Sequence, residues 1–244
     1  MKCLILAAGY ATRLFPLTEN FPKPLLQVGK STILDMLIDD IASTGFIDEY
    51  VVISNHRFYE HFSKWSDTRR ETIHVIDDGT MTNETRLGAV RDILFAVESM
   101  NICDDVLVIA GDNVLDFSLK GFLEFSKEKG ASCVMCHEEN DPAKKRKTAI
   151  ITKDANGLIT SYEEKPAVPK GNHAVPPFYA YPERDIKRIP EALCEGMNAD
   201  APGSFAAWLS KNEDVYAYEM PGKRYDVGDL ESYEEVKRRF DSDK

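Results

Sequence analysis

Small and basic residues follow the first apolar stretch of the sequence, and their types suit the binding of phosphate. The run Leu4–Ala8 leads into a loop of small residues, whose short side chains let an anion approach the backbone N–H groups. Arg13 ends this loop and can bind a phosphate in fork geometry, and Lys23 adds a second cation. The pattern predicts triphosphate binding, although a tight strand exit with two solvated cations would look the same. The nucleotide-binding residues expected here are Leu6, Ala8, Gly9, Ala11, Thr12 and Arg13.

Two aspartates are the candidate ligands for a metal ion beside such phosphates. Asp112 follows the apolar run Val106–Ala110, so it lies just past the carboxyl end of a predicted strand, where ligands bind in open α/β sheets. Asp226 is the second candidate, through the resemblance of its segment, Gly222–Asp229, given below. Mg²⁺ is held by one or two carboxylates together with substrate phosphates, so the pair Asp112 and Asp226 predicts a magnesium site. A helix cap or a turn is the structural alternative for Asp112.

Alternating strands and helices are expected to position these residues. The predicted strands are 2–7, 49–54, 72–76, 105–110 and 131–136, and the predicted helices are 31–43 (capped by Ser31), 58–65, 84–98 and 119–129. This alternation predicts βαβ units and an α/β fold with a mixed, mostly parallel central sheet. After about residue 140 the rhythm changes: strands at 147–152 and 158–162 flank the hairpin signal Asp154–Gly157, and a strand at 215–219 and a helix at 230–240 follow.

Composition narrows the classes of partner and location. The 244 residues carry 30 Lys+Arg against 41 Asp+Glu, a formal net charge of −11, which argues against nucleic acid and anionic membranes. No apolar run approaches the roughly 18 residues of a membrane span, and no signal peptide is expected. Five cysteines, an odd number, favour a reducing cytoplasm. Cys133 and Cys136 form a C-x-x-C within an apolar stretch that predicts a buried strand, and the five scattered histidines are predicted to be structural or surface residues.

The small-residue loop resembles the signature of the sugar-1-phosphate nucleotidylyltransferases, L-A-x-G-x-G-T-R-L-x-P-x-T followed by P-K-P. Four further segments resemble motifs of that family in the same order: Leu87–Ala89 (base-binding segment), Val106–Asn113 (strand ending in G-D-N), Tyr162–Pro166 (E-E-K-P) and Gly222–Asp229 (similar to W-x-D-I-G-T). The resemblance implies a Rossmann-like three-layer fold of the nucleotide-diphospho-sugar transferase type. It also implies Mg²⁺-dependent transfer of a nucleotidyl group from an NTP to a sugar 1-phosphate, with release of pyrophosphate.

The resemblance assigns roles to individual residues. Lys165 corresponds to the lysine that binds the phosphate of the attacking substrate, and Glu164 to its neighbour on the sugar hydroxyls. The implied catalytic residues are Arg13, Lys23, Asp112 and Lys165, and the implied acceptor-binding residues are Asn113, Ala149, Glu164, Lys165 and Pro177. Asn83 and Thr85, just before Gly88, are candidates for reading a base edge. The expected organisation is one domain, 1–244, with a nucleotide-binding half (1–130) and an acceptor-binding half (131–244); a homo-oligomer is compatible with it.

Three departures from the family pattern put the acceptor in question. Ala11 replaces the second loop glycine, which we expect to remove access to positive φ while adding one methyl group. Ala149 and Pro177 stand where glycines beside the sugar are usual, and proline has no N–H to donate. The acceptor is therefore expected to differ from plain glucose 1-phosphate. Alternatives are a cytidylyltransferase for phosphocholine-like or polyol phosphates, and a non-catalytic sugar-nucleotide sensor that keeps the fold.

Overall fold

The structure is a computed structural model, and it describes residues 1–241. Two compact units make up the chain. The first unit contains residues 1–87, 110–120 and the segment from 222 onward, and the second contains 88–109 and 121–221. The chain therefore crosses between the units four times, and each unit is built from segments far apart in the sequence. Among the described residues, no helix combines the length and the apolar character that a membrane span requires.

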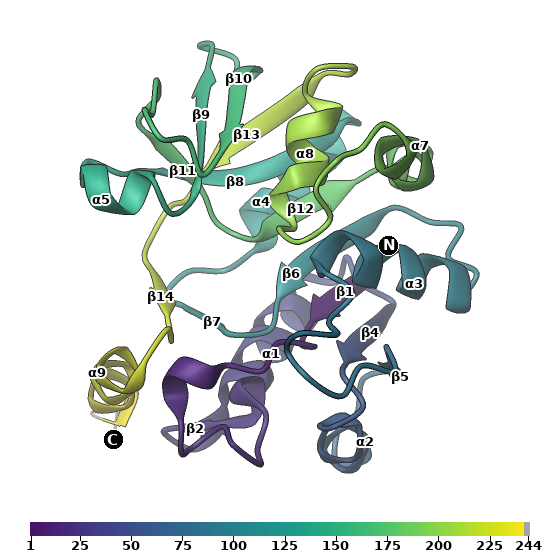
Figure 1. Cartoon of the computed structure of the whole chain (residues 1–244), viewed down its shortest axis with the longest axis vertical. Helices are drawn as coiled ribbons and strands as arrows, with labels where there is room; N and C mark the ends of the chain where they lie inside the picture. Colours follow the sequence, from purple (N-terminus) through teal and green to yellow (C-terminus); the bar gives the residue numbers. More distant parts are fainter. Residues whose placement is uncertain (242–244) are drawn as a thin grey trace. The chain divides into compact units, whose positions relative to one another are not determined.

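The first unit is built on a parallel sheet in which β4 lies between β1 and β5 (Figure 1). Its strands are β1 (Lys2–Leu6), β2 (Gln27–Val28), β3 (Ser31–Thr32), β4 (Glu49–Ser54), β5 (Ile73–Asp77), β7 (Asn113–Leu115) and β14 (Arg224–Asp226). Its helices are α1 (Ile33–Thr44), α2 (Tyr59–Ser66), α9 (Leu230–Asp241) and the short 3-10 helices η1 (Thr12–Leu14) and η2 (Lys23–Leu25). Helix α2 packs on β4 and β5, and β7 pairs with β14 in an antiparallel ribbon.

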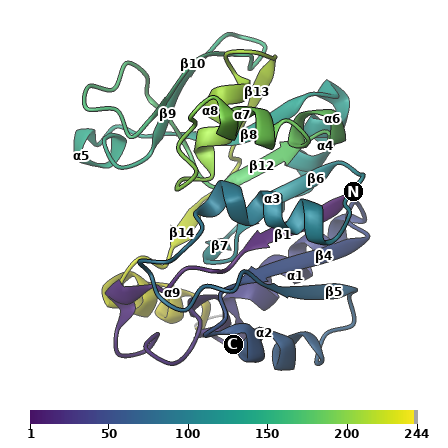
Figure 2. The same ribbon diagram turned by 45° about the vertical axis from the view of Figure 1, so that its right-hand side comes forward.

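The second unit contains a mainly antiparallel sheet in the order β10-β9-β11-β8-β12-β6, and β13 runs parallel to β8. Figure 2 shows β8, β12 and β6 in succession. Its strands are β6 (Val106–Ala110), β8 (Ser132–Glu138), β9 (Ala149–Lys153), β10 (Ile159–Glu164), β11 (His173–Val175), β12 (Phe178–Tyr181) and β13 (Val215–Glu219). Its helices are α3 (Ala89–Ser99), α4 (Lys120–Lys129), α5 (Pro142–Lys145), α6 (Glu183–Ile186), α7 (Ile189–Cys194) and α8 (Gly203–Leu209). Helix α8 packs on β10, and α7 packs on both α8 and α3.

The predicted α/β class with a mixed sheet is confirmed, and two predicted helix starts are wrong. Thr32, not Ser31, caps α1, because its hydroxyl accepts from the Asp35 N–H while the Asp35 carboxylate accepts from the Thr32 N–H. Helix α3 begins at Ala89 rather than Glu84, because Gly88 adopts φ 94° and a Cβ there would lie 2.8 Å from the Ala199 carbonyl oxygen.

Candidate active site

The predicted phosphate loop, residues 8–13, follows β1 in the first unit and is fixed at several points. The Asn55 side-chain amide, fully buried after β4, donates to the Ala8 carbonyl at 2.9 Å. The Thr18 hydroxyl donates to the Ala11 carbonyl at 2.8 Å, and the Leu14 N–H donates to the same oxygen at 3.0 Å. A Cβ placed on Gly9 would meet nothing within 4 Å, so this residue leaves open space beside the loop. The loop is thus rigidly placed with an open face at Gly9.

Ala11 adopts the conformation that its side chain was expected to exclude. Its φ of 45° and ψ of 42° lie in the left-handed region, so the expectation that alanine removes access to positive φ is wrong. Two sets of contacts hold the alanine in this glycine-like conformation. Its carbonyl accepts two hydrogen bonds, and its methyl group packs against the apolar cluster that contains Leu14 and Val227. The small residue therefore keeps the loop geometry at the expense of backbone strain.

The two predicted metal ligands both face the ammonium of Lys23. Lys23 Nζ donates to Asp112 Oδ2 at 2.7 Å and lies 3.8 Å from Asp226 Oδ1. The Lys23 side chain is only 10% exposed, whereas those of Asp112 and Asp226 are 35% and 54% exposed. The structure therefore brings together Lys23, Asp112 and Asp226, which are separated by up to 203 positions in the sequence. The antiparallel pairing of Asp226 with Asn113, between β14 and β7, is what places Asp226 there.

Asn113 is hydrogen-bonded to Asp112 of this cluster. Its side chain is fully buried, donates to the Ala110 carbonyl at 2.9 Å and to Asp112 Oδ1 at 3.1 Å, and accepts from Arg224 at 2.6 Å. In the first unit, Asn113 thus orients Asp112 and Arg224 rather than lining the cavity beside Lys23. Gly111, the residue before Asp112, packs closely on β1, because a Cβ there would lie only 3.0 Å from an Ile5 methyl group.

A cavity of about 160 Å³ in the first unit joins the loop to the charged cluster. It is lined by Leu6, Ala7, Gly9, Ala11, Arg13, Leu14, Lys23, Pro24, Ala110, Asp112 and Gly228. Arg13 is exposed and makes no hydrogen bond or ion pair with the described residues, although it helps to hold the pKa of Asp229 below its usual value after the hydrogen bonds from Ser232. An unpaired guanidinium and a lysine held between two carboxylates therefore share one cavity, as a site for phosphates and a cation would require.

The residues of the E-E-K-P motif, which are predicted to bind the acceptor, lie in the second unit. Glu164 ends β10, and burial raises the pKa of its carboxyl above the usual value, an effect that nearby Lys165 partly opposes. Lys165 adopts φ 47°, and its N–H donates to the Thr148 carbonyl at 3.2 Å. Left-handed backbone at a lysine that precedes Pro166 is a strained arrangement of the kind found at functional sites. Ala149 is buried at the start of β9 and pairs with Glu164.

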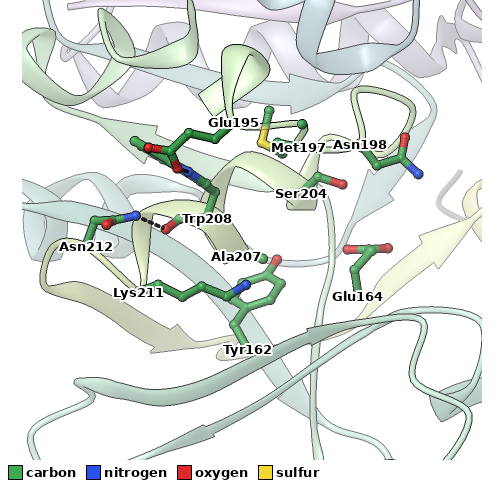
Figure 3. Close-up of a pocket in the computed structure, with 11 residues that line it drawn as sticks. Tyr162, Glu164, Glu195, Met197, Asn198, Ser204, Ala207, Trp208, Lys211 and Asn212 are labelled. Atoms are coloured by element: carbon green, nitrogen blue, oxygen red, sulfur yellow. Dashed lines mark hydrogen bonds between the residues drawn. The ribbon is translucent and has the colours of Figure 1, made fainter. Parts of the chain in front are cut away.

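A polar cavity of about 550 Å³ lies beside Glu164 in the second unit (Figure 3). Its lining residues are Tyr162, Glu164, Glu195, Gly196, Met197, Asn198, Ser204, Ala207, Trp208, Lys211 and Asn212. Of the predicted acceptor residues only Glu164 is among them; Ala149, Lys165 and Pro177 are not. The Tyr162 hydroxyl is buried and has no hydrogen-bond partner among residues 1–241, and burial raises its pKa well above the usual value. Sequence reasoning missed the segment from Glu195 to Asn212, because its polar residues match no motif.

Other predicted residues lie in exposed or structural positions. Asn83 and Thr85 belong to an exposed turn in which the Thr85 hydroxyl donates to the Thr82 carbonyl at 3.0 Å. Neither residue lines the cavity beside Lys23. Cys133 and Cys136 are fully buried on β8, and burial raises the pKa of their thiols, to about 12 for Cys133 and about 11 for Cys136, as expected for a buried strand.

The family of the chain follows from comparison with known proteins. A sequence profile of the nucleotidyl transferase family matches residues 2–242. The chain belongs to this family. The resemblance based on the five motifs is thereby confirmed.

Solved structures of nucleotidyl transferases share the fold. A UDP-glucose pyrophosphorylase complexed with UDP-glucose is 21% identical, with a TM-score of 0.83 over 98% of this chain and 97% of that one. A protein assigned as a glucose-1-phosphate thymidylyltransferase from Bacillus anthracis, in complex with a sucrose, is 22% identical, with a TM-score of 0.78 over 100% of this chain and 96% of that one. The predicted fold of the nucleotide-diphospho-sugar transferase type is therefore confirmed.

Proposed function

We propose that the protein transfers a nucleotidyl group from an NTP to a phosphorylated sugar or polyol and releases pyrophosphate. The observation that carries this proposal is the cluster of Lys23, Asp112 and Asp226 beside a phosphate loop that ends in an unpaired Arg13. The solved relatives named above are described as acting on glucose 1-phosphate or binding its UDP derivative, which supports a sugar phosphate as acceptor. The cytoplasmic location remains part of the proposal, supported by five cysteines that are all free thiols.

The residues of the cluster fit a divalent cation, on which this family generally depends. Among residues 1–241, no group of three or more His, Cys, Asp and Glu side chains is arranged to hold a metal ion. Two converging carboxylates remain, and Mg²⁺ is commonly bound by one or two carboxylates with phosphates completing its coordination. Asp112 and Asp226 would hold the ion. When bound, Mg²⁺ would neutralise phosphate charge and fix the phosphate orientation.

Positioning and charge neutralisation are the chemistry that the first unit offers. Nucleotidyl transfer brings an anionic acceptor phosphate in line with the α-phosphate, and the α–β phosphoanhydride bond breaks as the new bond forms. Arg13 would bind the β- and γ-phosphates in fork geometry and stabilise the leaving pyrophosphate. Lys23, already buried beside the carboxylates, would supply a cation at the reacting phosphates. No enzyme nucleophile is needed, because the acceptor phosphate itself attacks.

The second unit supplies the acceptor residues in this proposal. Lys165 is exposed, and its ammonium makes no hydrogen bond or ion pair with the described residues, so it would be available to bind the attacking phosphate. Glu164 would bind hydroxyl groups, because a carboxyl whose pKa is raised by burial is suited to neutral partners. The hydroxyls of Tyr162 and Ser204 beside it both donate and accept hydrogen bonds, as sugar hydroxyls do.

The same cavity favours a sugar or polyol phosphate over phosphocholine. A quaternary ammonium group needs open aromatic faces. The Trp208 ring already packs face-on against the Arg188 guanidinium, 4.8 Å from its centroid, and is stacked with Phe205 at 6.1 Å. Lys211 places a further positive charge at the cavity. We therefore propose a hydroxylated acceptor, with Ala149 and Pro177 distinguishing it from plain glucose 1-phosphate.

A panel of five NTPs and a series of phosphorylated sugars, polyols and phosphocholine, read by pyrophosphate release, tests the proposal. We expect Mg²⁺-dependent turnover with one pair, and we expect Asp112→Asn to abolish it while Asp67→Asn, an exposed aspartate at the end of α2, leaves it intact. Best turnover with glucose 1-phosphate would contradict the inference from Ala149 and Pro177. If the folded wild type turns over no pair, the non-catalytic sensor becomes the better interpretation, although a sensor has no use for paired metal ligands.

A further inference from the structure

Tyr10 extends from the phosphate loop toward the segment after β5, within the first unit. Its side chain is 5% exposed, and its hydroxyl lies 3.3 Å from the hydroxyl of Thr80, seventy positions away. Thr80 is itself 5% exposed and is held by Asp78, whose Oδ1 accepts from both the N–H and the hydroxyl of Thr80 at 2.7 Å. The Tyr10 ring also packs on Phe58, with centroids 6.2 Å apart. These contacts link the loop after β1 to the loop after β5.

The direction of the hydrogen bonds follows from the donor count. A threonine hydroxyl has one proton, and Thr80 gives it to the Asp78 carboxylate. The Tyr10 hydroxyl must therefore donate to Thr80 Oγ1, and the three side chains form one ordered series from Tyr10 through Thr80 to Asp78. Because Asp78 also accepts from the Thr80 backbone N–H, the Thr80 hydroxyl that receives the Tyr10 hydrogen bond is placed independently of the phosphate loop.

The strained residue of the loop lies next to Tyr10. Ala11 holds φ 45°, a conformation that an alanine leaves unless its neighbours prevent it. On its carboxyl side, Thr18 and Leu14 hold the Ala11 carbonyl. On its amino side, the adjacent residue Tyr10 is tied to the body of the unit through its side chain. The loop glycine of the family pattern would need no such restraint, because glycine enters the left-handed region freely.

We propose that Tyr10, Thr80 and Asp78 form a brace that positions the phosphate loop, and that this brace offsets the replacement of the loop glycine by Ala11. Tyr10 is thus a positioning residue for the triphosphate of the donor. The proposal rests on the proposed function, because it assigns a triphosphate to the loop. It predicts that the brace acts on phosphate binding and not on the acceptor.

Binding of Mg²⁺–tripolyphosphate, measured by calorimetry, tests the brace without knowledge of the base. We expect Tyr10→Phe and Thr80→Val each to raise Kd about five- to tenfold, the effect of losing one or two hydrogen bonds. The double variant should bind no more weakly than the weaker single one. The matched control is Tyr50→Phe, because Tyr50 is a buried tyrosine of the same unit whose hydroxyl has no hydrogen-bond partner among the described residues. In turnover, KM for the NTP should rise while KM for the acceptor stays unchanged.

The role of Ala11 is tested by coupling. In an Ala11→Gly background, Tyr10→Phe should raise Kd less than twofold, because glycine needs no restraint there. Tyr10→Phe and Thr80→Val binding as tightly as Tyr50→Phe would overturn the brace while leaving the proposed function intact. A full effect of Tyr10→Phe in the Ala11→Gly background would overturn the link to Ala11. A wild type that binds neither tripolyphosphate nor any NTP would overturn the proposed function and the brace with it.

Discussion

Replacement of Lys23 by methionine tests the charged cluster most directly, because the structure places this ammonium between two carboxylates. The 2.7 Å bond to Asp112 is a charge-assisted hydrogen bond, for which about 1.5–3 kcal/mol is typical. The 3.8 Å approach to half-exposed Asp226 contributes about 1 kcal/mol in a water-like dielectric. Methionine also removes the desolvation of a buried ammonium, which offsets part of the loss. We therefore expect Lys23→Met to lower the free energy of unfolding by about 2 kcal/mol, equivalent to about 4–8 °C in Tm.

Magnesium should reverse much of this loss. In the wild type a divalent cation competes with the Lys23 ammonium for Asp112, and in Lys23→Met it does not. We expect about tenfold tighter Mg²⁺ binding by the variant, hence about 1.4 kcal/mol of extra stabilisation at a fixed Mg²⁺ concentration well above both Kd values. Thermal melts over a Mg²⁺ series without nucleotide measure both effects. The control is Lys153→Met, which loses a single surface partner, Glu219 at 3.1 Å, and should show a small shift that Mg²⁺ does not change. Equal Mg²⁺ shifts for wild type and Lys23→Met would refute the reasoning.

Three further predictions concern the second unit. Gly203→Ala should raise KM for the acceptor severalfold without changing KM for the NTP, because a Cβ there would lie 2.7 Å from Glu164 Oε2 and 2.8 Å from the Tyr162 hydroxyl. Steady-state kinetics with each substrate varied in turn would measure both KM values. An effect on both KM values would contradict the prediction. Glu164→Gln should become more stable than wild type as the pH rises above the usual glutamate pKa. The reason is that the pKa of Glu164 is raised in the folded protein, so ionisation of Glu164 lowers the free energy of unfolding of wild type. In thermal melts from pH 4 to 8, the advantage of the variant should vanish at the acidic end. Gly88→Ala should lower the free energy of unfolding by at least about 2 kcal/mol, because φ 94° is strained for alanine and the Cβ would lie 2.8 Å from the Ala199 carbonyl oxygen. Chemical denaturation measures the change. A variant as stable as wild type would rule out the positive φ at residue 88.

The strands with strong apolar patterns could be predicted from the sequence almost to the residue. The strands at Glu49–Ser54 and Val215–Glu219 have the predicted bounds, because apolar runs flanked by polar residues leave little choice of register. The cap of α1 could also have been found, since Thr32 and Asp35 have capping-box spacing. Strands of three residues such as β7 and β14 carry too little pattern to be recognised, and their pairing is a long-range property.

The candidate site shows the same limit more sharply. Motif matching identified Lys23, Asp112 and Asp226 individually, but it gave no reason for the lysine to lie between the aspartates. That arrangement depends on the pairing of Asp226 with Asn113, which joins residues more than a hundred positions apart. The conformation of Ala11 could not be predicted either, because the intrinsic preference of alanine opposes it and long-range packing and hydrogen bonds hold it.

The C-terminal segment belongs to the same unit as the proposed phosphate loop, although it lies at the opposite end of the sequence. Tyr233 on α9 donates to the Gln27 carbonyl at 2.7 Å, and it packs with Val227 and Val236 in the apolar cluster that also contains Leu14. The first residues after β1 therefore rest on a helix formed more than two hundred positions later. Asp226 lies shortly before this helix in the chain, so the packing of α9 helps to place the second carboxylate of the cluster. The same packing supports Leu14, which follows the proposed phosphate loop. The proposed donor site therefore depends on both ends of the chain, a dependence that the expected halves 1–130 and 131–244 do not include.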